Sequence, residues 1–193
     1  MSFWGIFLYS IRALAFAVPV GAVWAAVFFW RIKRRGEALH RTAFWSGLLL
    51  ALYLAALLQI TVIRDWGAFY AFMSQSHTMA TVQPIPLKTT LEALEGGLWS
   101  LCYHVIGNMI WFVPFGLLGA AAYARLRRWR ILLPEAAGLS LAIEALQWCF
   151  ATGVSDIDDV LLNTLGAALG LLLWQAVCAA YDRIQHSKKG GKK

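Results

Sequence analysis

Charged residues are scarce in this sequence. Asp, Glu, Lys and Arg together make up 14% of its 193 residues, and only ten residues are acidic. Hydrophobic residues account for 60% and the mean hydropathy is +0.62, whereas soluble domains contain about 45–50% apolar residues. This composition excludes an ordinary soluble domain and predicts an integral membrane protein.

Cysteine is also scarce, and the arrangement of the basic residues excludes a further class of protein. The spacing of Cys102, Cys149 and Cys178 matches no metal or redox motif, and we predict buried free thiols. The formal net charge is +7, but the basic residues form short clusters beside apolar runs rather than one polar face. We therefore predict no nucleic-acid partner.

Five apolar runs are long enough to cross a bilayer, whose core of about 30 Å needs about 20 helical residues. We predict an all-α integral membrane bundle of about five transmembrane helices, forming one domain over residues 1–181. The basic segment 182–193 has no apolar face to bury and is predicted to be a disordered tail. Residues 64–99 are predicted to form an ordered loop with a surface helix. The five runs cover residues 13–30, with 3–11 as an extension, and 42–63, 100–123, 131–150 and 160–181.

The distribution of Lys and Arg predicts the orientation of the bundle. Fourteen of the 17 basic residues fall in three clusters, at 31–41, 125–130 and 183–193. Because cytoplasmic flanks carry the excess of Lys and Arg, we predict that these clusters and the C-terminus are cytoplasmic. Five crossings then place the N-terminus, the 64–99 loop and the tip after the fourth span outside.

The segment from Glu144 to Asn163 holds four of the ten acidic residues. Glu144 lies about 9 Å below the outer end of the fourth span, where a charged carboxylate costs about 2.5–3.5 kcal/mol, so it needs a partner or a proton. His104 and Asn108 share one helical face of the third span. We expect spans three to five to surround an outward-facing polar pocket. The predicted binding residues are Asn108, Glu144, Gln147, Asp156, Asp158, Asp159 and Asn163.

The three aspartates at the predicted outer tip allow two interpretations. Ser155 or Asp156 caps the fifth helix, while Asp158 and Asp159 lie in its first turn and are favoured by the helix dipole. Alternatively, Asp156, Asp158 and Asp159 together hold Mg²⁺ or Ca²⁺, since both ions prefer oxygen ligands. The sequence leaves both interpretations open.

Glu144 also has two interpretations. It forms a hydrogen bond with Gln147 or Asn163 that fixes the bundle, or it faces a ligand as an acid or base with His104 as proton partner.

On the fifth span, Gly166-x-x-x-Gly170 permits close helix approach.

The order of these motifs resembles the VanZ-like family. Residues 107–116 read Gly-Asn-Met-Ile-Trp-Phe-Val-Pro-Phe-Gly, and Glu144-x-x-Gln147 follows. Residues 156–170 read Asp-Ile-Asp-Asp-x-x-x-Asn-Thr-x-Gly-x-x-x-Gly. The resemblance covers about residues 84–170, including Pro84-Ile-Pro86. Many members carry an arginine shortly before the aspartates, where this chain has Thr152-Gly-Val-Ser155.

The resemblance implies a multi-pass protein of the bacterial cytoplasmic (inner) membrane, whose relatives give resistance to teicoplanin-type glycopeptides. We predict that the polar site binds a membrane lipid or a lipid-linked cell-envelope precursor. The alternative is a membrane enzyme that acts on an extracytoplasmic lipid-linked saccharide or phosphate, with Glu144, His104 and Asp159 as candidate catalytic residues. A lipid or ion transporter ranks third, because the inner halves of the spans carry few polar residues.

Overall fold

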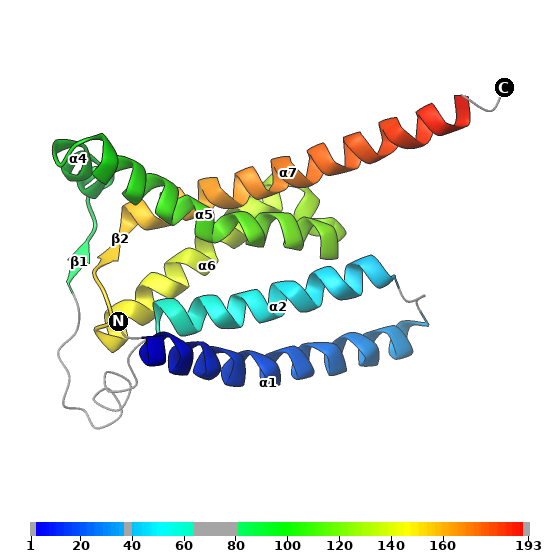
Figure 1. Cartoon of the computed structure of the whole chain (residues 1–193), viewed down its shortest axis with the longest axis horizontal. Helices are drawn as coiled ribbons and strands as arrows, with labels where there is room; N and C mark the ends of the chain where they lie inside the picture. Colours follow the sequence, from blue (N-terminus) through cyan, green and yellow to red (C-terminus); the bar gives the residue numbers. More distant parts are fainter. Residues whose placement is uncertain (1–2, 37–39, 64–80, 191–193) are drawn as a thin grey trace.

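A computed structural model describes residues 3–36, 40–63 and 81–190, and this part of the chain is mostly helical (Figure 1). Two very short strands accompany the helices. In chain order the elements are α1 (Phe3–Arg35), α2 (Arg41–Thr61), β1 (Val82–Gln83), α4 (Lys88–Glu95), α5 (Leu98–Ala122), the 3₁₀ helix η1 (Ala124–Arg127), α6 (Trp129–Phe150), β2 (Ser155–Asp156) and α7 (Ile157–Gly190).

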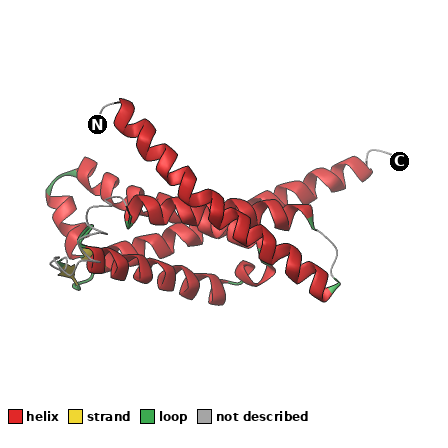
Figure 2. Ribbon diagram, turned by 90° about the horizontal axis from the view of Figure 1, so that it is seen from below, coloured by secondary structure: helices red, strands yellow, loops and turns green. Residues whose placement is uncertain are grey.

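Helices α5 and α7 form the most extensive pair in the molecule. Helix α2 packs on α5, α6 packs on α7, and α1 packs mainly on α2. Figure 2 shows α1 crossing the other helices obliquely. The apolar core lies among α2, α5, α6 and α7 and includes Leu57, Phe112, Phe115, Leu132, Ile143 and Leu171.

Glycines explain how closely α5 and α7 approach. A Cβ atom on Gly166 would lie 2.0 Å from the carbonyl oxygen of Met109, and one on Gly170 would lie 2.1 Å from that of Val113. On the other helix, a Cβ atom on Gly116 would lie 2.0 Å from the carbonyl oxygen of Ala167. The close approach predicted from Gly166-x-x-x-Gly170 is confirmed, because any larger residue would force the backbones apart.

Three helices of the described chain are long and apolar enough to cross a membrane: α2, α5 and residues 157–187 of α7. A helical membrane protein therefore fits the structure, whereas the count of five spans stays a prediction. Helix α6 has 22 residues, enough for about 33 Å, but Glu144 and Gln147 lower its mean hydropathy.

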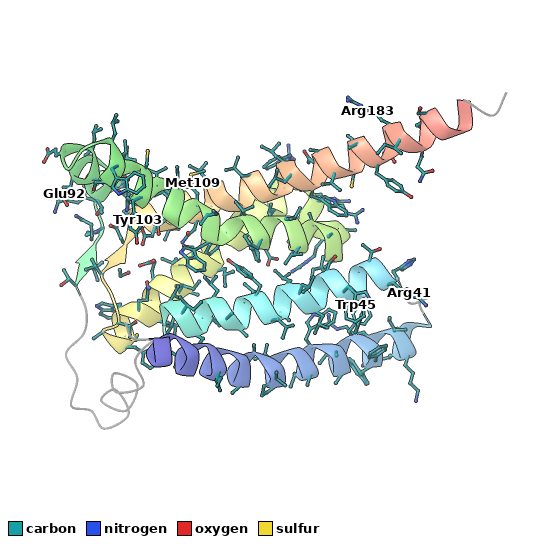
Figure 3. The ribbon with its side chains drawn as sticks, viewed as in Figure 1. Arg41, Trp45, Glu92, Tyr103, Met109 and Arg183 are labelled. Carbon is teal, nitrogen blue, oxygen red and sulfur yellow. The ribbon has the colours of Figure 1, made fainter. Side chains whose placement is uncertain are left out.

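The two ends of the molecule differ in character. The adjoining ends of α1 and α2, the η1 segment and the end of α7 lie toward one end (Figure 1). Figure 3 shows Arg41 and Arg183 in this region, which we call the basic end. Glu92 and Tyr103 lie toward the opposite end, together with α4, β1 and β2. The predicted clustering of the basic segments is seen here, and which end faces the cytoplasm stays a prediction.

The structure differs from the sequence-based expectation at the end of α7 and at the cysteines. Helix α7 continues to Gly190 instead of giving way to a disordered tail at Asp182, because extending an existing helix adds one hydrogen bond per residue fixed. Cys102 is exposed rather than buried, while Cys149 and Cys178 are half-buried; all three are free. The predicted surface helix is α4, and residues 64–80 of the predicted loop lie outside the described part.

A short parallel ladder joins β1 to β2. Val82 pairs with Ser155 and Gln83 with Asp156. The backbone N–H of Ser155 also donates to the carbonyl of Thr81 over 3.0 Å. This ladder holds the segment before α4 against the start of α7.

Candidate functional site

The acidic residues predicted from the sequence meet where α6 ends and α7 begins. We call Glu144, Asp156, Asp158 and Asp159, together with His104 and Asn108 on α5, the polar cluster. Its members come from α5, α6, β2 and the first turn of α7, and the outward-facing pocket stays a prediction. Most of them are joined by specific hydrogen bonds, which assign a different role to each carboxylate.

Asp156 caps α7. Its Oδ1 accepts the backbone N–H of Asp158 over 2.9 Å, and α7 begins at the residue between them. An Ncap side chain that accepts from the second helical residue satisfies one of the four free N–H groups at a helix start. The helix-cap interpretation is thus confirmed for Asp156.

Glu144 supports this cap from α6. Its Oε2 accepts the backbone N–H of Asp156 over 2.8 Å, and both residues are buried, with Glu144 only 3% exposed. The partner that a carboxylate needs at this depth therefore includes a backbone amide of the turn after α6, whereas one of the two sequence-based interpretations named the Gln147 or Asn163 side chain. This bond fixes the end of α6 to the start of α7.

Asp158 caps a different helix. Its Oδ1 accepts the backbone N–H of Leu87, and its Oδ2 accepts both the N–H and the hydroxyl of Thr90, each over 2.9 Å. Leu87 and Thr90 are the Ncap and N3 positions of α4, which has no capping side chain of its own. Asp158 is 1% exposed. It satisfies the free N–H groups of a helix about 70 residues earlier in the chain.

The backbone of Leu87 shows why α4 needs this external cap. Its φ is +64°, in the left-handed region, where a residue with a Cβ atom is less stable by about 1–2 kcal/mol. The hydrogen bond from its N–H to Asp158 helps to offset this strain. The proline-containing turn that enters α4 is therefore held by a residue of α7.

Asp159 is the carboxylate of the polar cluster that remains accessible. Its Oδ1 accepts a hydrogen bond from the Asn108 Nδ2 on α5, and both residues are half-buried rather than buried. His104 lies one turn earlier on α5 and is also half-buried; its Nε2 is 3.3 Å from the hydroxyl of Thr90. These three side chains form the accessible face of the polar cluster.

The carboxylates act on one another electrostatically. The charges of Asp156 and Asp159 interact with Glu144, and those of Asp156, Asp158 and His104 interact with Asp159. His104 also interacts electrostatically with Asp158 and Asp159. A concentration of acids in a poorly hydrated region favours a positively charged or hydrogen-bond-donating ligand.

Two further predicted binding residues bridge helices. The Gln147 Nε2 donates to the carbonyl of Thr61 at the end of α2 over 3.3 Å, and the Asn163 Nδ2 donates to the Ser140 hydroxyl on α6 over 2.8 Å. The Asn163 bond is buried. Both amides fix helices to one another in this structure.

The metal interpretation of the aspartates has little geometric support. Asp156, Asp158 and Asp159 accept from α7, α4 and α5 respectively, so their carboxylates serve three different partners. Within the described ranges no three His, Cys, Asp or Glu side chains are arranged to hold a metal ion. A divalent cation stays a prediction.

The comparison with known proteins agrees with the motifs of the polar cluster. Residues 48–178 match the VanZ/LLP1 family, and this match covers α5, α6 and most of α7. The chain is 32% identical over 130 residues to "Protein VanZ" of Enterococcus faecium, which is 65% of this chain and 71% of that protein. The chain belongs to the VanZ/LLP1 family. No solved structure matches it.

Sequence reasoning missed several partners at this site. Thr61, Ser140 and Thr90 each pair with a predicted site residue, but threonine and serine are common in apolar helices and carry no distinctive spacing. The capping of α4 by Asp158 is non-local, and no sequence pattern indicates it. Of the two helix caps at this site, the sequence indicated only that of α7, through the acidic residues at its start.

Proposed function

We propose that the polar cluster binds a cell-envelope component or a lipid-linked precursor on the outer side of a bacterial cytoplasmic membrane, and that this binding lowers susceptibility to teicoplanin-type glycopeptides. Membership of the VanZ/LLP1 family and the similarity to the enterococcal "Protein VanZ" support the link to glycopeptide resistance. The orientation that places the polar cluster outside follows from the three basic segments at the other end.

One observation carries the binding proposal: Asp159 and Asn108 form an accessible hydrogen-bonded pair beside buried acids. The other aspartates of the polar cluster have backbone partners, so they position the site rather than contact the ligand. Asp159 is the member whose carboxylate is both accessible and bonded to another side chain instead of the backbone.

The chemistry of the polar cluster narrows the part of the ligand that it contacts. Four carboxylates would repel a phosphate or diphosphate group. Hydroxyl groups of a sugar or amino groups of a peptide are hydrogen-bond donors that suit the oxygens of Asp159 and Asn108. We therefore infer that the cluster contacts the saccharide or peptide portion of the ligand, while any phosphate lies outside it.

The test is a teicoplanin susceptibility assay in a sensitive bacterial strain. The wild-type chain is expected to raise the minimal inhibitory concentration, and Asp159→Asn is expected to return it to the level of the empty vector. Asn keeps the size of Asp and an acceptor oxygen for Asn108 but removes the charge. Asp182→Asn, an exposed residue near the other end of α7, is the matched control and is expected to protect fully.

Membrane abundance is measured for each variant by immunoblotting. Full protection by Asp159→Asn at equal abundance would contradict the binding site. A wild-type chain that fails to raise the inhibitory concentration would contradict the resistance function itself.

A second candidate function is the enzyme predicted above, and the arrangement of His104 favours it. His104 and Asp159 are both half-buried and lie on α5 and α7, which pack together, and a histidine and a carboxylate are the side chains that general acid–base catalysis often uses. The candidate catalytic residues stay Glu144, His104 and Asp159, of which His104 and Asp159 are the more accessible. Release of a cleaved product from a lipid-linked saccharide by purified wild-type protein, lost in His104→Gln, would favour catalysis over binding alone.

A further inference from the structure

A cavity of about 880 Å³ lies between α1, α2 and α5, toward the basic end and away from the polar cluster. Its size is within the range of about 300–1,000 Å³ typical of sites that enclose small molecules. Most of its lining is apolar and includes Val27 and Phe28 of α1, Leu54 and Leu58 of α2, and Phe115 of α5. Such a wall suits a hydrocarbon chain.

The shape of this cavity depends on specific contacts rather than on loose packing alone. Trp24 packs so closely on α2 that a Cβ atom on Gly47 would lie 2.2 Å from its ring. The Trp24 Nε1 also donates to the Tyr123 hydroxyl over 3.0 Å, which links α1 to the end of α5. Trp24, Gly47 and Tyr123 all line the cavity, so these contacts form part of its wall.

Charged groups occur in the lining where the three basic segments converge. Arg31, Arg125 and Glu135 line the cavity. The Arg125 guanidinium pairs with the Glu135 carboxylate over 2.9 Å. Arg31 is exposed, and no carboxylate of the described residues forms an ion pair with it. The cavity therefore joins an apolar wall to an exposed arginine that forms no ion pair with a carboxylate of the described residues.

We propose that this cavity holds an acyl chain of an anionic phospholipid from the leaflet at the basic end, with the phosphate of the lipid on Arg31. An anionic head group complements the exposed Arg31 guanidinium and the surrounding basic clusters. Each Lys or Arg close to a membrane surface attracts anionic lipid. A zwitterionic lipid offers the same chain without the net charge. This inference does not depend on the proposed function of the polar cluster.

Native mass spectrometry of the purified full chain in detergent tests the proposal. The protein is mixed with equal amounts of phosphatidylglycerol and phosphatidylcholine that carry identical chains. We expect one phosphatidylglycerol to be retained per chain under collisional activation that removes phosphatidylcholine. Arg31→Gln is expected to reduce this retention about fivefold, as removal of one favourable charge would. Added inorganic phosphate is expected not to displace the lipid, because the acyl chain supplies much of the binding.

Two variants separate the cavity from general surface charge. Val27→Trp places a large ring in the lining and is expected to lose the retained lipid, with its melting temperature measured to verify folding. Lys33→Gln removes an exposed charge from the same helix outside the lining and is expected to retain the lipid. Equal retention of both lipids, equal losses in Arg31→Gln and Lys33→Gln, retention by a folded Val27→Trp variant, or displacement by phosphate would each overturn the proposal.

Discussion

At the scale of single residues, neighbouring aspartates serve different helices. Successive residues of a helix point about 100° apart, so Asp158 and Asp159 face different neighbours although they are adjacent in sequence. Asp158 reaches α4, Asp159 reaches α5, and Asp156 turns back on its own helix. Position within the first turn of α7 therefore decides which carboxylate is structural and which is accessible.

Because Asp158 caps α4, we predict that Asp158→Ala increases local opening at the start of α4. The substitution removes three hydrogen bonds, one to Leu87 and two to Thr90. Loss of a helix cap typically lowers the stability of the helix by about 1 kcal/mol. We expect hydrogen exchange of the Leu87 and Thr90 amides to accelerate at least about fivefold, the equivalent of about 1 kcal/mol. Thr90→Val removes only the hydroxyl bond and is expected to show a smaller increase. Unchanged exchange in Asp158→Ala would contradict the capping role.

The sequence predicted the members of the polar cluster better than their roles. Glu144, Asn108 and Asp159 were identified because polar groups are rare and expensive in apolar helices. The choice between cap and metal ligand for the aspartates was left open, since it depends on which backbone amides lie nearby. Asp158 illustrates this limit, because its partners on α4 are about 70 residues away in the sequence.

At the scale of elements, the contact between α5 and α7 depends on the absence of side chains. Gly116, Gly166 and Gly170 allow each backbone to touch the other. This contact sets Asn108 of α5 against Asp159 of α7, because Asn108 directly precedes Met109, which Gly166 touches, and Asp159 lies about two turns before Gly166. The geometry of the accessible pair therefore depends on residues that have no polar group.

We predict that Gly166→Ala destabilises the protein although it adds only a methyl group. Its Cβ atom would lie 2.0 Å from the carbonyl oxygen of Met109, and the backbone there cannot yield without separating the helices. Overpacking of this kind costs about 1–3 kcal/mol. Thermal unfolding in detergent is the measurement, and a lower melting temperature is expected.

Gly107→Ala is the matched control, since a Cβ atom on Gly107 of α5 meets nothing within 4 Å. It is expected to leave the melting temperature unchanged or to raise it, because Ala favours a helix over Gly by about 1 kcal/mol. Equal melting temperatures for Gly166→Ala and Gly107→Ala would show that the close contact is not required.

Long apolar runs in the sequence predicted the long helices well, whereas the short strands were not predicted. The starts of α2, α5 and α6 fall within about two residues of the predicted spans, since hydrophobic length determines them. The ladder between Val82 and Ser155 was not predicted, because two-residue strands leave no periodic pattern. The existence of α4 was expected from the sequence, but its attachment to α7 was not.

At the scale of the whole molecule, the polar cluster and the basic segments occupy opposite ends. Cysteine accessibility tests whether these ends lie on opposite sides of a membrane. In a variant with the three native cysteines replaced by serine, we expect Val154→Cys to react with a membrane-impermeant maleimide in intact cells. Ser187→Cys is expected to react only after the membrane is permeabilised, because it lies near the basic end of α7. Both positions are exposed in the structure.

Lysed cells provide the control for this experiment, since both cysteines should react there. Reaction of Ser187→Cys but not of Val154→Cys in intact cells would reverse the predicted orientation. Reaction of both positions in intact cells would show that α7 does not cross the membrane, contrary to its length and apolar composition.

The number of crossings was the least secure prediction at this scale. Composition alone identified a membrane protein, and α2, α5 and α7 agree with it. Helix α6 is harder to classify from its sequence, because the pairing of Glu144 with the Asp156 amide and of Gln147 with the Thr61 carbonyl appears only in three dimensions. Polar residues whose partners lie inside a bundle reduce apparent hydropathy without preventing a helix from spanning.

The hydrogen bond between Asp158 and the start of α4 also affects the order in which these segments can fold during synthesis. Asp158 is made 71 residues after Leu87, which corresponds to about 4–14 s of synthesis at about 5–20 residues per second. During that interval α4 lacks its cap, and β1 lacks its partner strand. The polar cluster therefore forms only after α7 has emerged, so nascent chains halted before Asp158 would display α4 without the fold that positions Asp159.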